Sequence, residues 1–444
     1  MSREDELARS SAEAVTRRSY GKLVAFLAAR TRDVAGAEDA LSDAFAAALA
    51  DWPKNGVPEN PEAWLLAVAR RKLIDGVRRH RTSEQSADHL QLLSEELEDM
   101  AASQQDIPDD RLALMFACAH PAIEQAIRAP LILQTILGFD AATIASAFLV
   151  SPAAMSQRLV RAKAKIKDAG IAFAVPDAGD LRDRLETVLE AIYAAFAEGW
   201  SDPAGTEVRR RNLAQEGIWL GRLVASLLPD EPEALGLLAL MLYAEARRDA
   251  RRNAQGEYVP LNEQDTARWD ARLIDEAETL LRYASRMQRT GRFQLEAAIQ
   301  SAHVVRRLAG RSDWGAIEAL YDALIAMTGS PVAAINRAIA VAETKGASAA
   351  LAALDACAED ARLKEYQPYW AARAGLLARA GEVDAARKAY ELAIGLESDP
   401  AVREFLQRRC EELRRRPKKK SCKQIDRAAM PSALRIALPT DRKG

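Results

Sequence analysis

Apolar positions recur at helical spacing through most of the chain, and the clearest example lies at 151–167. There they fall at i, i+4, i+7 and i+11 and form one continuous stripe, made of Met155, Leu159, Ala162 and Ile166. Ser151 and Pro152 predict the start of this helix. Serine caps free backbone N–H groups, and proline lacks the N–H that would otherwise stay unpaired at the first helical position.

A shorter helix precedes this one. Asp140 is its candidate N-cap, and its apolar side comprises Ile144, Ala145, Phe148 and Leu149. The other faces of the second helix carry many cations, namely Arg158, Arg161, Lys163, Lys165 and Lys167. Two helices with so short a connection indicate a helix-turn-helix whose cationic second helix suits the DNA major groove. The alternative is an ordinary amphipathic hairpin whose charged side chains are simply hydrated.

Two further helices are predicted near the N-terminus. The segment 37–49 has one apolar side, made of Ala37, Leu41, Ala44, Phe45, Ala48 and Leu49, while Glu38, Asp39 and Asp43 lie largely on another. After a loop at 52–60, Pro61 begins a helix in which Trp64 is followed by the cations Arg70, Arg71, Lys72, Arg78 and Arg79. The cations suit phosphates, and an exposed tryptophan stacks on unpaired bases. The alternative role of Trp64 is to anchor the helix in the core.

Composition and charge limit the class of protein. A chain of 444 residues is too long for one core, and 49% hydrophobic with only 6% aromatic residues favours closely packed helices. The net charge of −2 means that any binding of a polyanion is local. The four cysteines form no CxxC pair, which argues against a zinc site. No signal peptide or membrane-spanning run is recognisable, so a cytoplasmic protein with no membrane partner is expected.

Charge blocks suggest the domain boundaries. Residues 82–110 follow a basic helix, contain no lysine or arginine and carry nine carboxylates, which predicts a linker. A second boundary is predicted at 174–179, where proline and glycine occur together. The residues from 414 onward form a basic tail that is predicted to be flexible.

The C-terminal half is helical in pattern and contains weak repeats. Gly310, Gly346 and Gly381 are spaced by 36 and 35 residues, close to the tetratricopeptide period of about 34. The clearest repeat comprises Trp370, Gly381, Ala386, Tyr390 and Ala393, and its small–large–small spacing recurs at Ala316, Leu320 and Ala323. Stacked helix pairs would form a groove for a peptide or protein. The candidate partner contacts in this groove are Arg268, Trp269 and Asp270. The alternative role of Trp269, and the favoured one, is to pack the corner between two helices.

Three sequence blocks resemble those of a known family. The segments 37–45 (AEDALSDAF) and 61–75 (PEAWLLAVARRKLID) resemble domain two of extracytoplasmic-function (ECF) sigma factors, and 157–163 (QRLVRAK) looks like their domain four. The remainder resembles the subgroup with a large tetratricopeptide-like (TPR-like) extension, on the segments 237–242 (LLALML) and 264–270 (QDTARWD). Arg71 stands where the family commonly has asparagine.

The resemblance implies three sets of functional residues. Those implied to bind core RNA polymerase are Glu38, Asp39, Leu41, Asp43 and Phe45. Those implied to bind the promoter −10 element are Trp64, Arg70, Arg71, Lys72, Arg78 and Arg79. Those implied to bind the −35 element are Ser151, Ala153, Ala154, Ser156, Gln157, Arg158, Arg161, Lys163 and Lys165.

The expected architecture is all-α. We expect a sigma domain two helical bundle at 10–82, an acidic linker at 83–107, a sigma domain four with the helix-turn-helix at 108–170, a TPR-like helical regulatory domain at 177–413 and the tail at 414–444. The linker either imitates a nucleic-acid backbone inside polymerase or is a solubilising tether.

The expected function is that of a sigma factor, which binds core RNA polymerase and promoter DNA and directs transcription initiation. Its C-terminal domain would control that activity through an intramolecular or protein contact. The alternative is a helix-turn-helix regulator with a TPR scaffold that never joins polymerase. A purely structural TPR adaptor would leave both basic helices unexplained. An enzyme is disfavoured, and no cofactor or metal is expected, because the chain lacks a glycine-rich phosphate loop, a nucleophile elbow and a histidine–carboxylate cluster.

Overall fold

The computed structural model describes residues 15, 19–80, 107–148, 150–177, 180–200, 208–360 and 363–415. The chain divides into two compact units, Met1–Glu198 and Gly199–Gly444. All regular elements of the described residues are helices, which confirms the all-α prediction, and one isolated β-bridge joins Arg252 to Tyr258. No described helix combines the length and apolar character needed to cross a bilayer.

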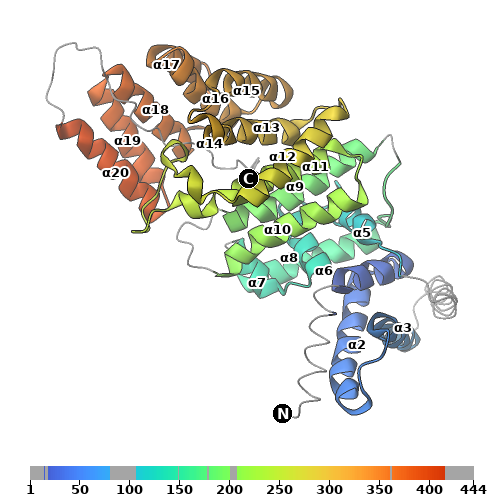
Figure 1. Ribbon diagram of the computed structural model, residues 1–444. Coiled ribbons are helices and arrows are strands. Elements are labelled where there is room, and N and C mark those ends of the chain that lie inside the picture. The colour runs from blue at the N-terminus through green and yellow to red at the C-terminus, as the bar shows by residue number, and fades with distance from the viewer. Residues whose placement is uncertain are drawn as a thin grey trace. The chain divides into compact units, whose positions relative to one another are not determined.

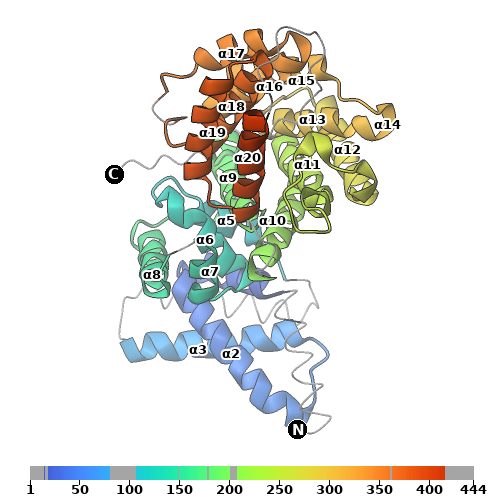
Figure 2. The same ribbon diagram turned by 90° about the vertical axis from the view of Figure 1, so that its left-hand side faces the viewer.

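The first half of the N-terminal unit consists of a helix at 19–31, α2 (Val34–Asn55) and α3 (Pro61–His80), and α2 packs on α3 (Figure 2). Asp33 caps α2 by accepting from the Gly36 N–H at 3.0 Å. Asn60 does the same for α3, with the Ala63 N–H at 3.0 Å. The predicted start of a helix at Pro61 is therefore confirmed.

The predicted loop at 52–60 is wrong in its first part, because α2 continues to Asn55 with Pro53 in its last turn. Trp52 explains the extra turn. Its side chain is only 2% exposed, and its ring meets the edge of the Trp64 ring with centroids 5.6 Å apart. The helix then ends where Gly56, at φ 85°, donates its N–H to the Trp52 carbonyl.

The second half of this unit contains α5 (Arg111–Cys118), α6 (Gln125–Leu137), α7 (Ala141–Ala147), α8 (Pro152–Asp168) and most of α9 (Leu181–Trp200). The last two residues of α9 belong to the C-terminal unit. Asp140 caps α7, since its carboxylate accepts from the Thr143 N–H at 2.7 Å. Ser151 caps α8 through the Ala154 N–H at 3.3 Å. The predicted stripe of α8 is buried throughout, which confirms it.

The apolar side predicted for α7 is also borne out. Ile144 and Ala145 are fully buried and Phe148 is half-buried, while Leu149 lies outside the described residues. The two halves of the unit meet closely at Gly21 on the helix 19–31. A Cβ there would lie 2.2 Å from the Ile136 carbonyl oxygen of α6, so any larger residue would force the two helices apart.

The C-terminal unit begins with α10 (Val208–Leu227), α11 (Pro232–Ala246), α12 (Ala271–Arg286), α13 (Arg292–Val304) and the single turn α14 (Arg306–Ala309). Gly236 of α11 permits a close approach, because a Cβ there would lie 2.7 Å from the Gln294 backbone nitrogen of α13. The expectation of continuous helix is wrong at 247–270. This stretch holds three short 3₁₀ turns, η1 (Arg248–Arg251), η2 (Leu261–Glu263) and η3 (Thr266–Arg268).

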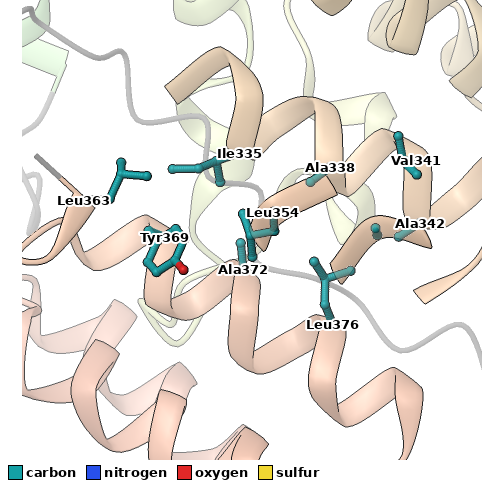
Figure 3. Close-up of a cluster of buried hydrophobic side chains, with 10 residues drawn as sticks. Ile335, Ala338, Val341, Ala342, Leu354, Leu363, Tyr369, Ala372 and Leu376 are labelled. Atoms are coloured by element: carbon teal, nitrogen blue, oxygen red, sulfur yellow. The ribbon is translucent and has the colours of Figure 1, made fainter. Parts of the chain in front are cut away.

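The unit continues with six helices in which each packs on the next, α15 (Trp314–Thr328), α16 (Pro331–Thr344), α17 (Ala347–Asp355), α18 (Gln367–Ala380), α19 (Val383–Leu396) and α20 (Pro400–Arg415) (Figure 1). Figure 3 shows one core of this stack, where Ile335 of α16, Leu354 of α17 and Leu376 of α18 converge. Gly346 and Gly381 both have positive φ and lie in the tight turns after α16 and α18.

The small–large–small stripe is confirmed in α19 and wrong in α15. Ala386, Tyr390 and Ala393 of α19 are buried. In α15, Ala316 and Ala323 are exposed and Leu320 is half-buried. The buried face there is made one residue later by Ile317, Tyr321 and Leu324, because these larger side chains remove more apolar surface from water.

Candidate nucleic-acid interface

The exposed face of α8 carries most of the residues that were assigned to the −35 element. Of the residues assigned to the −35 element, Ser151, Ala153, Ser156, Gln157 and Arg158 are exposed, and Ala154 is half-buried. Arg161 and Lys165 are exposed on the same helix. Because the opposite stripe is buried in the unit, α8 presents a rigid cationic surface to solvent. Such a surface can neutralise phosphates and can place side chains against base edges.

Lys163 differs from its neighbours on α8 because it is paired within the unit. Its Nζ lies 2.6 Å from Oε2 of Glu38 on α2, and the two side chains are only 12% and 11% exposed. Burial raises the pKa of the Glu38 carboxyl, although the Lys163 ammonium acts in the opposite direction. In this conformation, Lys163, which was assigned to DNA, therefore forms an ion pair with Glu38, which was assigned to polymerase.

A second ion pair joins the same two helices. Lys167 Nζ lies 2.7 Å from Oδ2 of Asp33, the N-cap of α2. Asp33 was not among the predicted site residues. Its position before a helical stripe identifies a capping residue, but the partner is 134 residues away and no local pattern indicates it.

The other residues assigned to polymerase have different environments. Asp39 and Asp43 are exposed, and Phe45 is half-buried. Leu41 is fully buried on the apolar side of α2, so in this conformation its side chain packs in the core and is not accessible to a partner. Asp43 Oδ2 lies 3.4 Å from Lys72 Nζ of α3, and both side chains are well exposed. An exposed pair of this kind contributes about 0–1 kcal/mol, so both charges remain available to a partner.

The residues assigned to the −10 element lie along α3 and differ in their exposure. Trp64 is half-buried against Trp52, so its ring is partly a packing residue and partly accessible. Arg70 is half-buried, and Arg71 and Lys72 are exposed. The backbone of α3 includes Arg78 and Arg79, whose side chains lie outside the described residues. α3 thus carries cations on an exposed helical surface beside a partly accessible indole.

Cys118 is a core residue. Its side chain is fully buried and its Sγ lies 3.5 Å from the Thr135 hydroxyl. Burial raises the pKa of this thiol to about 12, so it remains protonated at neutral pH. Within the part of the chain that the structure describes, no three His, Cys, Asp or Glu side chains gather in a way that could hold a metal ion.

The residues proposed as C-terminal partner contacts serve the corner between η3 and α12. Asp270 caps α12 by accepting from the Arg272 N–H at 2.8 Å, and Arg268 donates to the Arg252 carbonyl at 2.7 Å. Trp269 is only 4% exposed, so its ring packs the interior of this corner. A direct contact between the Trp269 ring and another protein would require the corner to open.

Comparison with known proteins identifies two parts of the chain. Residues 16–83 match Sigma-70 region 2, and residues 184–285 match a Family of unknown function (DUF6596). The chain is 38% identical over 387 residues to an uncharacterized protein of Rhizobium meliloti (strain 1021). The aligned region covers 86% of this chain and 90% of that protein. No solved structure matches the chain significantly.

Proposed function

Since the chain belongs to the same family as the Rhizobium meliloti protein and carries a sigma-70 region 2, we propose that it is an ECF-type sigma factor that directs core RNA polymerase to particular promoters. The observation that carries this proposal is the match at 16–83. It covers both α2, with its exposed acids, and α3, with its exposed cations. Sigma-70 factors are not enzymes, and the proposed activity requires binding alone.

In the proposed arrangement, α2 contacts polymerase and α3 contacts the promoter −10 element. Asp39 and Asp43 lie on the exposed side of α2, where they would meet a basic surface of polymerase. Arg71 and Lys72 of α3 would neutralise phosphates, and Trp64 would stack on a base freed from the duplex.

The helix-turn-helix of α7 and α8 is the proposed −35 reader, within a sigma domain four at 108–170. Its support is the geometry of α8, whose apolar stripe is buried and whose cations Arg158, Arg161 and Lys165 are exposed. In a helix-turn-helix, residues near the start of the second helix read base edges and later cations hold phosphates. We assign Gln157 and Arg158 to bases, and Arg161 and Lys165 to phosphates.

Residues 177–413 make up the proposed TPR-like regulatory domain. Consecutive helix pairs such as α15–α16 and α18–α19, joined at turn glycines or short loops, support this assignment. Such stacks offer extended surfaces for a partner. We propose that this domain controls initiation through contact with the sigma domains or with another protein.

The first test is binding of the full chain to purified core polymerase. The double substitution Asp39→Lys and Asp43→Lys should abolish binding, because it reverses two exposed charges on α2. Glu59→Lys is the matched control, since Glu59 is also exposed in region 2 but lies in the loop before α3. Equal binding by both variants would refute the role of α2. Strong DNA binding by a chain that never joins polymerase would favour the alternative helix-turn-helix regulator.

A further inference from the structure

Three arginines of the C-terminal unit lie on neighbouring elements, and none of them has an ion-pair partner among the residues that the structure describes. Arg247 follows the end of α11, Arg251 lies in η1 and Arg306 begins α14. Arg247 is only 6% exposed, while Arg251 and Arg306 are half-buried. None of the three forms an ion pair with a residue that the structure describes. By contrast, the adjacent Arg248 pairs with Glu245 at 2.8 Å and Arg252 pairs with Asp399 at 2.8 Å.

The three side chains bind only neutral groups of the chain. Arg247 donates to the Tyr243 carbonyl at 3.2 Å and to the Gln300 side-chain oxygen at 2.5 Å. Arg251 donates to the Trp200 carbonyl at 3.1 Å, and Arg306 donates to the Gln264 carbonyl at 2.9 Å. These bonds satisfy some N–H groups, and the Arg251 guanidinium carbon also lies 4.6 Å from the centroid of the Trp200 ring. The Asp399 carboxylate partly offsets the charge of Arg251, so the uncompensated charges are chiefly those of Arg247 and Arg306. A buried charge is costly unless an opposite charge accompanies it.

The charges of Arg251 and Arg306 both act on the buried guanidinium group of Arg247. Burial, together with the charges of Arg251 and Arg306, lowers the pKa of Arg247 to about 10. Burial and the charges of Arg247 and Arg306 lower the pKa of His303 to about 3, so this imidazole is neutral at pH 7. The interior around Arg247 and His303 therefore has a positive potential.

A second observation that points to a ligand comes from two unpartnered polar groups in the same region. The indole N–H of Trp269, a residue 4% exposed, has no hydrogen-bond partner among the described residues. The Arg306 guanidinium carbon lies 5.2 Å from the centroid of that ring. The side-chain oxygen of Gln264, a residue 8% exposed, also has no partner within the described part of the chain. Native proteins leave few such groups unsatisfied unless a ligand or water binds them.

We propose that Arg247, Arg251, Arg306 and Trp269 bind the oxyanion group of a small molecule. Guanidinium groups bind phosphate and carboxylate oxygens through paired N–H donors, and the indole adds one more donor. The free Gln264 oxygen would accept from a hydroxyl group, such as the protonated oxygen of hydrogen phosphate. Because Arg247 is almost completely buried, the site suits a compact anion and not the continuous backbone of a nucleic acid.

Phosphate is the favoured source of the oxyanion, because three guanidinium groups offer more donors than the two oxygens of a carboxylate require. This assignment concerns the C-terminal unit alone. It stands or falls independently of whether the chain is a sigma factor.

The test is a titration of the full chain with inorganic phosphate, and separately with succinate, at constant ionic strength set by sodium chloride. Calorimetry and the unfolding temperature Tm are measured together. We expect a saturable heat signal and a saturable rise in Tm with phosphate. Saturation with succinate alone would support the site and assign it to carboxylates. Absence of saturation with both anions would overturn the proposal.

Variants locate the site. Arg306→Gln, at a half-buried position, should weaken the binding of the saturating anion by about tenfold or more, because it removes a charged hydrogen bond. Arg306→Lys should retain part of the affinity, because it keeps the charge but not the paired donors. Arg272→Gln is the matched control, since Arg272 is exposed on α12, and it should bind as the wild type does. Unchanged affinity in both Arg306 variants would refute the assignment even if the wild type binds anions.

Discussion

α8 and the C-terminal unit both concentrate positive charge, but they hold it in opposite environments. Arg158, Arg161 and Lys165 of α8 are exposed and hydrated. Arg247 is buried, and Arg251 and Arg306 are half-buried beside it. Hydrated cations cost little in the free protein and are available to an extended polyanion. Buried cations destabilise the free protein and favour a compact anion that replaces the water they have given up. The same residue type therefore indicates two kinds of partner.

The largest expected effect is on DNA binding. Replacing Arg158, Arg161 and Lys165 together with alanine should weaken binding of the polymerase complex to promoter fragments by about a hundredfold or more. The slope of log affinity against log salt should fall by about 0.9 for each phosphate that the variant no longer neutralises. Fluorescence anisotropy over a range of salt concentrations measures both quantities. The Arg272→Ala control should change neither, and an unaltered slope in the triple variant would show that α8 does not contact phosphates.

The next effect is on stability and depends on the anion. In saturating phosphate, Arg247→Met should lower the free energy of unfolding by about 2–3 kcal/mol, because it removes a buried charged donor and its ligand. In phosphate-free buffer the decrease should be smaller, because removing the charge of Arg247 also relieves its repulsion with the charges of Arg251 and Arg306. Urea unfolding in both buffers provides the measurement. Arg158→Ala, at an exposed position, should stay within about 0.5 kcal/mol in either buffer. An equal decrease for Arg247→Met in both buffers would indicate a purely structural arginine.

The pH dependence of stability follows from His303. Its pKa is lowered from the ordinary 6.5 to about 3, so the unfolded chain takes up a proton between these values and the folded chain does not. The stabilisation is present above about pH 6.5 and is lost as the pH falls toward 3. From pH 7 to pH 5 the decrease at this site should be about 2 kcal/mol. Urea unfolding of His303→Gln at the two pH values should show a decrease smaller by that amount. Identical decreases in variant and wild type would contradict the assignment.

The smallest effect concerns the ion pair between Glu38 and Lys163. Its exposure is intermediate between that of the exposed cations of α8 and that of the buried Arg247. Their side chains are 11% and 12% exposed, and the two atoms lie 2.6 Å apart. A double-mutant cycle with Glu38→Gln and Lys163→Met should give a coupling free energy of about 1 kcal/mol. Lys165, which is exposed, serves as the control partner and should show no coupling to Glu38. Zero coupling for Lys163 would show that its ion pair with α2 contributes nothing to stability.

Local sequence signals predicted the parts of the site that depend on neighbours in the chain. The stripe from Met155 to Ile166 and the caps at Asp140 and Ser151 were correct, because helical periodicity and capping act within a few residues. The class of the N-terminal region could be recognised for the same reason, since its two blocks are contiguous segments.

Long-range contacts could not be predicted from these patterns. Lys163 and Glu38 are 125 residues apart. Likewise, Arg306 is more than fifty residues after Arg247 and Arg251, the other two arginines of the proposed anion site. The irregular corner at 247–270 was also missed, although Gly256, at φ 79°, and Pro260 are local signals that interrupt a helix there. In α15 the choice between two apolar faces was decided by side-chain volume, which a pattern of small residues does not capture.

Transcription by purified core polymerase tests the central claim most directly. Single-round reactions on a library of genomic fragments would be run with three protein mixtures. These are core polymerase alone, core polymerase with the full chain, and core polymerase with the Asp39→Lys, Asp43→Lys double variant. The account predicts discrete transcript starts that appear only with the full chain and disappear with the variant. If the full chain neither associates with core polymerase nor produces any new transcript start, the chain does not act as a sigma factor.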